Sequence, residues 1–185
     1  MPLSLLVPPA SEPVSLAELK SYLRVEHADE DALIERLIVA ARAACEARTR
    51  RAFLAQTWRL TRPHWPRDGQ IDVPLAPLAT VAAARSVAAD GSATALDVAR
   101  FTLLAGAAPG LVLVRPPLPA PEAGGHVELD LVAGYGTEAA DVPADLAEAV
   151  RRLAAIFYEH RGASGAADMP ADIAGLLAAH RVVSL

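Results

Sequence analysis

Residues 29–58 decide how this chain folds: DEDALIERLIVAARAACEARTRRAFLAQTW. Acidic side chains fill positions 29–31, and arginines occur at positions 48, 50 and 51. This order suits a helix, because acidic groups complement the positive end of the helix macrodipole and basic groups its negative end. The pattern therefore predicts a helix from about Glu30 to Arg50, followed by a strand that begins near Gln56.

Apolar residues within this predicted helix recur every three or four positions, in two adjacent stripes. One stripe consists of Leu33, Leu37, Ala41 and Ala44, and the stripe beside it of Ile34, Ile38, Ala41 and Cys45. The charged residues outside the first stripe are Glu35, Arg36, Arg42 and Glu46. Such a wide apolar face predicts the main helix of a small domain.

A short helix precedes the long one. Ser15 is a good N-cap residue and Glu18 follows three positions later, which is the pattern of a capping box. Val14 and Leu19 occupy the two positions of a hydrophobic staple. Residues 1–13 are rich in proline, and we expect them to form an extended arm that leads into this helix.

The pattern changes after Arg51, where prolines and glycines become frequent and the apolar spacing falls towards two. Asp90-Gly91 is a strong hairpin signal, and residues 106–110 form a second glycine-containing turn. The expected strands are residues 56–61, 71–75, 81–88, 94–97, 101–104, 111–114 and 127–132. Residues 55–135 therefore predict a small antiparallel β subdomain.

Helical spacing returns near residue 141. Pro143 suits the first turn of a helix, and one face of that helix is apolar: Leu146, Val150, Leu153 and Phe157. Gly162 is expected to end the helix, and residues 162–168 form a Gly/Ser/Ala linker. A last short helix over 170–179 precedes an apolar tail that has no obvious place in the chain's own core.

The sequence thus predicts one α+β domain over residues 1–185. Helices from both ends of the chain form its core, and the antiparallel β subdomain is inserted between them. The expected parts are the arm 1–13, helices over 14–51, the β insert 55–135, a helix over 141–162, and a last helix and tail over 163–185.

Composition narrows the possible roles. The 185 residues carry a formal net charge of −5, which provides no basic surface for nucleic acid. Cys45 is the only cysteine, and its place within a helix favours a small core residue over a reactive thiol. Residues 1–10 lack a basic secretion signal, and the uncharged run 101–114 is too short to cross a bilayer. We therefore expect synthesis in the cytoplasm.

No catalytic, cofactor or metal motif is present. The chain lacks CxxC, HExxH and a phosphate-binding glycine loop, and its five histidines have no ligand spacing. Residues 134–136 (Gly-Tyr-Gly) stand between a strand and a helix, where an anion could bind. Glu138 and Asp141 would repel a phosphate there, which favours a simple turn. The sequence therefore predicts no catalytic residue, no cofactor and no metal ion.

Two pairs of residues have alternative interpretations. Glu128 and Asp130 point the same way on one strand and could act as paired carboxylates, but we interpret them as solvated surface residues. Trp58 and Trp65 could stack on nucleic acid bases. Trp58 follows the alternation of a core strand, so packing is the favoured interpretation, and Trp65 is interpreted as a loop anchor or interface residue.

The order of several motifs resembles the head–tail connector (adaptor) proteins of tailed double-stranded-DNA phages and of phage-derived gene transfer agents. The N-terminal part of the resemblance runs through VSLAELKSYLRVEHADEDALIERLIVAARAACEARTRRAFLAQTWRL. Later pieces are AGYG at 133–136, VP at 142–143, YEHR at 158–161 and the final LLAAHRVVSL. The individual motifs are weak, but their shared order and spacing are specific, and they cover nearly the whole chain.

The resemblance implies a structural virion protein at the head–tail interface and not an enzyme. Such adaptors form a ring, usually dodecameric, that extends the DNA channel beneath the portal and docks the tail through a tail-side connector or stopper. DNA would pass through the lumen without specific binding, which suits the negative charge. In this chain the implied portal-binding residues are Arg181, Val182, Val183, Ser184 and Leu185.

Two other functions remain open from the sequence. The chain could be a stopper or tail-completion protein, which would contact tail proteins but not the portal. It could also be an enzyme or small-ligand module with a site in the β insert, which would need a deep polar pocket near Glu128, Asp130 and Tyr135.

Overall fold

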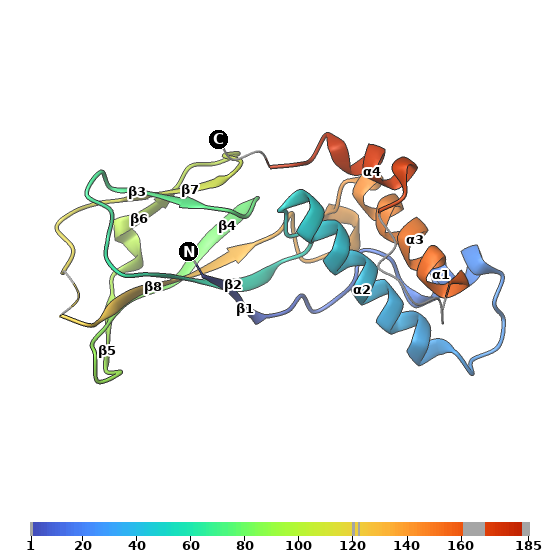
Figure 1. The fold of residues 1–185 in the computed structure, drawn as a ribbon, viewed down its shortest axis with the longest axis horizontal. Helices are drawn as coiled ribbons and strands as arrows, with labels where there is room; N and C mark the ends of the chain where they lie inside the picture. Colours follow the sequence, from blue (N-terminus) through green and yellow to red (C-terminus); the bar gives the residue numbers. More distant parts are fainter. Residues whose placement is uncertain (1, 120, 122, 161–168, 183–185) are drawn as a thin grey trace.

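The computed structural model describes residues 2–119, 121, 123–160 and 169–182. The molecule is elongated, with a β half at one end and a helical half at the other (Figure 1). The helices are α1 (Leu16–Leu23), α2 (Asp31–Thr49), α3 (Ala144–Glu159) and α4 (Ala171–Ala178), with short 3-10 turns at Val98–Arg100 and Ala139–Asp141. The strands are β1 (Leu3–Val7), β2 (Gln56–Arg62), β3 (Gln70–Val73), β4 (Leu78–Val87), β5 (Ala93–Leu96), β6 (Phe101–Leu103), β7 (Gly110–Val114) and β8 (His126–Ala133). The predicted α+β class is confirmed.

The helical half is built from both ends of the chain. α2 packs against α3, and α1 and α4 cover the same pair of helices (Figure 1). Their apolar faces share one core with the following fully buried large side chains: Leu19, Ile34, Ile38, Phe53, Leu54, Leu146, Ile173 and Leu177. Because no short amphipathic helix is stable alone in water, this shared burial is what keeps all four folded.

Local signals set the start of α1. Ser15 Oγ accepts a hydrogen bond from the Glu18 N–H at 3.2 Å, and a Glu18 carboxylate oxygen accepts one from the Ser15 N–H at 2.7 Å. This is the predicted capping box. The two staple residues Val14 and Leu19 are both buried, as predicted.

The long helix α2 differs from its prediction in which face it buries. The stripe with Ile34, Ile38 and Cys45 is fully buried, whereas Leu33 and Leu37 are only half-buried. Arg42, which the spacing placed outside the apolar stripe, is 6% exposed. The helix is therefore covered on its polar flank as well, by residues outside the helix that spacing alone does not reveal.

The β half consists of two antiparallel sheets. Within the described residues, one sheet has five strands in the order β1-β2-β8-β4-β5, and the other has three in the order β3-β7-β6. Both predicted hairpins, β4-β5 and β6-β7, are present. A second core fills the space between the sheets, and its most buried members are Leu60, Ile71, Val73, Val112, Leu129 and Leu131.

The N-terminal residues extend into the β half. Within the expected extended arm, Leu3–Val7 form β1, which pairs antiparallel with β2. β1 is thereby an edge strand of the five-stranded sheet. The chain then crosses to the helical half before α1, so the two halves are connected by more than the α2–β2 passage (Figure 1).

Candidate interaction site

The C-terminal segment is fixed where the two halves meet. The Val182 N–H donates to the carbonyl oxygen of Thr49, the last residue of α2, at 2.9 Å. Arg51 Nε donates to the carbonyl oxygen of His180 at 2.6 Å. His180 Nε2 lies 2.6 Å from a carboxylate oxygen of Asp145, at the start of α3. Burial raises the pKa of Asp145, but the hydrogen bond and charge of His180 outweigh burial and lower it.

These contacts divide the residues that the resemblance assigned to portal binding. Arg181 is exposed, and Val182 is only 7% exposed. Val183, Ser184 and Leu185 lie outside the described residues. The expectation that the tail has no place in the chain's own core is therefore wrong for Val182, which packs at the end of α2. Gly162 and the linker 162–168 also lie outside the described part of the chain.

Glu46 joins α2 to the β half. Its carboxylate accepts hydrogen bonds from the Phe53 N–H at 2.8 Å, from Gln56 Nε2 at 2.7 Å and from Arg42 Nη1 at 2.7 Å. Arg42 Nε also donates to Glu12 at 2.7 Å. Burial raises the pKa of Glu46, although the Phe53 hydrogen bond and the Arg42 charge oppose that effect. One carboxylate therefore satisfies donors from the helix, the turn after it and the first residue of β2.

A network of ion pairs covers the outer face of the five-stranded sheet. Arg59 on β2 lies 2.7 Å from Asp130 and 3.3 Å from Glu128, both on β8. Arg85 on β4 lies 3.0 Å from Glu128 and also contacts Asp130. Burial raises the pKa of Asp130, but the hydrogen bond from Arg59 and the charges of Arg85 and Arg59 together lower it.

Because of this network of ion pairs, the interpretation of Glu128 and Asp130 as solvated residues is wrong. Asp130 is 7% exposed, and both carboxylates are held between arginines of the two flanking strands. With each acid neutralised by two guanidinium groups, neither is placed to act as a general base. The alternation of residues on β8 predicted that these two side chains share one face of the strand. Their arginine partners lie on β2 and β4, which the sequence did not place next to β8.

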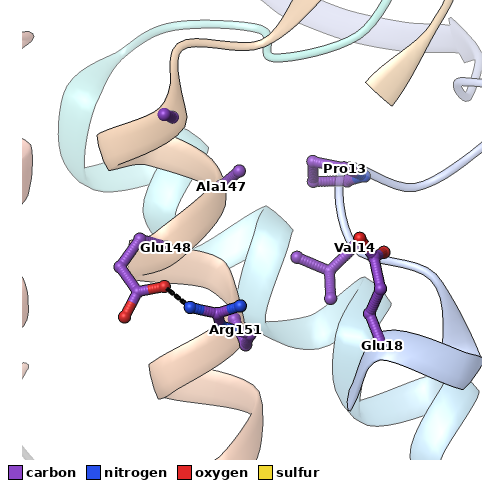
Figure 2. A pocket seen from close by; sticks show the side chains of 7 residues that line it. Pro13, Val14, Glu18, Ala147, Glu148 and Arg151 are labelled. Carbon is purple, nitrogen blue, oxygen red and sulfur yellow. Dashed lines mark hydrogen bonds and ion pairs between the residues drawn. The ribbon is translucent and has the colours of Figure 1, made fainter. Parts of the chain in front are cut away.

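A shallow groove of about 310 Å³ lies between the N-terminal segment and α3. Figure 2 shows Pro13, Val14 and Glu18 on one side and Ala147, Glu148 and Arg151 on the other. Arg151 pairs with Glu148, and its guanidinium lies 5.2 Å from the ring centroid of Tyr22. The Glu148 and Arg151 side chains of this groove pair with each other, and Glu18 is held by Ser15, so these polar groups are already engaged within the chain.

A larger and more apolar groove, of about 450 Å³, lies between β1 and α2. Leu3 and Leu5 of β1, Val39 of α2 and Trp58 of β2 contribute apolar walls. Leu5 and Val39 are 45% and 43% exposed. Exposed aliphatic side chains grouped around a groove are typical of a surface that a protein partner covers.

The two tryptophans pack within the β half. Trp58 and Trp65 are partly buried against its core, and the Trp65 ring centroid lies 5.4 Å from that of Phe101. The packing interpretation of Trp58 is confirmed. Cys45 is fully buried, and burial followed by the charge of Glu46 raises the pKa of its thiol to about 12, which also confirms a core role.

Within residues 2–119, 121, 123–160 and 169–182, no three His, Cys, Asp or Glu side chains are grouped closely enough to hold a metal ion. In the same part of the chain, no helix has the length and apolar character needed to span a bilayer.

Comparison with known proteins identifies what this arrangement is similar to. The family of phage gp6-like head–tail connector proteins matches residues 13–85. A chain in the virion of a native gene transfer agent particle is 34% identical, with a TM-score of 0.85, and the match covers 100% of this chain and 97% of that one. The chain belongs to the head–tail connector family. No curated protein sequence matches this connector.

Two further solved structures match the connector over the same shares, 100% of this chain and 97% of theirs. One is the neck of the native gene transfer agent particle, computed with C12 symmetry, at 33% identity and a TM-score of 0.81. The other is the neck of the empty particle, computed with C6 symmetry, at 32% identity and a TM-score of 0.84. The family is one of head–tail connector proteins, and these structural neighbours are parts of the neck or virion of a gene transfer agent particle.

Sequence reasoning missed the polar residues that organise the connector's surface. The sequence held only a weak indication of the ion pairs among Glu46, Arg42 and Glu12. Two of these residues are charged positions beside the buried stripe of the long helix α2. The indication for Arg59 and Arg85 was stronger, since each falls on a strand position that alternates away from the core. In both cases the missing information was which distant segment lies alongside.

Proposed function

We propose that the connector forms a dodecameric ring between portal and tail, extends the DNA channel, and docks the tail through a tail-side connector or stopper. The observation that carries this proposal is full-length similarity to a chain of a neck computed with C12 symmetry. Its site of action is then the head–tail interface of a virion or gene transfer agent particle, and its role is mechanical and not catalytic.

The C-terminal residues Arg181–Leu185 are proposed to bind the portal. Support comes from the way the base of this segment is held: Thr49, Arg51 and Asp145 fix His180 and Val182 from three sides. A segment with a fixed base loses less conformational entropy on binding than a free one. An apolar, β-branched sequence also suits pairing with an exposed strand edge of a partner.

The lumen of the proposed ring would carry DNA without holding it. The net charge of −5 opposes binding to phosphates, because a protein that grips DNA neutralises phosphates with lysine and arginine. The described arginines of the sheet face are already paired with Glu128 and Asp130. We expect no measurable affinity for duplex DNA at physiological salt.

Co-sedimentation with purified portal rings tests the proposal. The full chain is expected to bind in about twelve copies per portal, and deletion of residues 181–185 is expected to abolish binding. Deletion of 183–185 alone leaves the Val182 contact with Thr49 intact and should also weaken portal binding, which separates loss of portal contacts from loss of that internal contact. Thermal unfolding of all three chains checks that each remains folded.

The outcome separates the open alternatives. Full portal binding by the 181–185 deletion, with the fold intact, would overturn the assignment of the tail. Absence of portal binding by the full chain, together with cross-links to tail proteins only, would identify a stopper or tail-completion protein instead.

A further inference from the structure

We propose that β1 of one connector copy pairs antiparallel with the open first half of β4 in the next copy, so that the five-stranded sheet continues around the ring. This inference rests on the proposed ring and adds the surfaces that close it. It concerns the contact between copies, which is independent of the portal contact made by the tail.

Both strands have an unused hydrogen-bonding edge. β1 is the outer strand of its sheet and, among the described residues, pairs with β2 alone. At the opposite side, β5 pairs with residues 84–87 of β4, so residues 78–83 have β8 on one side and no strand on the other within the described chain. Each open edge presents backbone N–H and C=O groups that a further strand can satisfy.

The two edges lie at the same level of the sheet. Leu5 pairs with Trp58, Trp58 with Leu131, and Leu131 with Val81, so one row crosses the sheet from β1 to the open part of β4. All these pairings are antiparallel, so strand direction alternates across the sheet. Two strands, β2 and β8, lie between β1 and β4, and β1 and β4 therefore run in opposite directions. Adding β1 of the next copy beside β4 therefore continues the antiparallel alternation.

Neither edge carries the charges that normally protect an exposed strand. Residues 3–7 read LSLLV and residues 78–84 read LATVAAA. Leu5, Leu6 and Val7 are 45%, 41% and 56% exposed. Natural edge strands use lysine, proline, inward-pointing charge or β-bulges to prevent pairing with another chain. Both edges contain register shifts, between Leu5 and Val7 in β1 and at 78–80 and 81–83 in β4, but no charged residue. Uncharged edges with small residues on β4 and aliphatic residues on β1 favour such pairing instead.

The apolar groove beside β1 accounts for the side chains of the added strand. Leu5 faces the same side of the sheet as Trp58, and both line that groove. Leu78 and Val81 face that side as well, because they pair with Ala133 and Leu131. In a continued sheet Val81 of the next copy lies beside Leu5, and Leu78 lies further along, level with Pro8, which also lines the groove.

The number of strands sets the size of the proposed ring. Four strands per copy cross this level of the sheet, and neighbouring strands are spaced about 4.8 Å apart. Twelve copies then give a band of about 230 Å in circumference, or about 70 Å across. A contact between two different edges is head-to-tail, which is the kind that closes rings.

Disulfide trapping in portal-bound connector tests the pairing. Two double variants, S4C with T80C and S4C with A82C, place cysteines on exposed positions of the two edges. The control S4C with S92C moves the second cysteine to the exposed β4–β5 turn. The native Cys45 is fully buried and does not contribute. Mild oxidation is expected to give a reducible ladder of dimers and higher multimers for at least one test pair, and monomer for the control.

Amide exchange supplies a second measurement that needs no substitution. Ring assembly is expected to slow exchange of residues 3–7 and 79–83 by about tenfold or more, while residues 70–73 of β3 remain unchanged. If rings form on the portal but neither test pair cross-links above the control and neither edge is protected, the edge pairing is overturned and the connector function stands. If no ring forms, the proposed function fails and the edge pairing fails with it.

Discussion

The two halves of the connector are held together in different ways. The helical half buries aliphatic stripes from four helices in one core, and each stripe is set by spacing within its own helix. The β half has a comparable core on one side of its main sheet, but its other side is fixed by Arg59, Arg85, Glu128 and Asp130. Local periodicity therefore defines the helical half, whereas pairs of residues far apart in the sequence define the β half.

The largest expected effect is in the helical core. Leu146→Ala removes a fully buried side chain from the core of the helical half, and should lower the free energy of unfolding by about 3 kcal/mol. Urea titration followed by circular dichroism measures this. Leu104→Ala, at a position that is 51% exposed in the β half, is the control and should change stability by less than about 0.5 kcal/mol. Equal losses would contradict the assignment of the core.

The next effect concerns the joint between the halves. Glu46→Ala leaves the Phe53 N–H, Gln56 and Arg42 without their acceptor and should cost about 2 kcal/mol. Glu46→Gln, which keeps one acceptor, should cost less. Both tryptophans lie in the β half, so their fluorescence reports that half while helical dichroism reports the other. We expect the unfolding curves from fluorescence and from dichroism to coincide in the natural chain and to separate in Glu46→Ala. If the two curves coincide in both proteins, Glu46 does not couple the unfolding of the two halves.

A smaller effect distinguishes the sheet face by its pH dependence. The pKa of Asp130 is lowered in the folded chain, so its contribution to stability is present above the ordinary carboxyl pKa near 4 and is lost as pH falls through the lower folded value. Asp130→Asn should cost about 1 kcal/mol at pH 7 and flatten the loss of stability between pH 4 and pH 2. Unfolding curves at several pH values provide the measurement. An unchanged acid profile in the variant would show that Asp130 does not contribute through its charge.

The smallest effect is local to α1. Ser15→Ala removes the acceptor for the Glu18 N–H and should lower stability by about 0.5 kcal/mol. Ser21→Ala, at an exposed position of the same helix, is the control and should be neutral or slightly stabilising, because alanine is the better helix former. Thermal unfolding of the two variants checks the difference, and a loss in Ser21→Ala as large as that in Ser15→Ala would argue against the cap.

Much of the fold followed from the sequence because its signals are local. Ser15 with Glu18 predicted the start of α1, the aliphatic spacing from residue 33 onward predicted α2, and Asp90-Gly91 predicted the β4–β5 hairpin. The family resemblance was also confirmed, since it depends on the order of such local motifs. The residues assigned to portal binding remain a prediction that the experiments above address.

The misplaced residues share one cause. Arg42 was placed outside the apolar stripe of α2, Asp130 on a solvated face, and Val182 in a tail with no obvious place in its own core, yet each is buried. Their partners are Glu12, Arg59 and Thr49, which lie 30, 71 and 133 positions away. No spacing rule reaches across such separations, because a charged or terminal residue reads as exposed until another segment covers it.

The sequence by itself determined the α+β class, the helix starts and hairpin turns, the aliphatic stripes and the family. These depend on backbone preferences and side-chain periodicity within a few turns of helix or strand. The tertiary structure was needed to show which charges are buried together, how residues 180–182 are held against α2 and α3, and which strand edges stay open within the described residues. Those features depend on distances between segments that are remote along the chain, and burial and hydrogen bonding acquire their energies only once those segments are in contact.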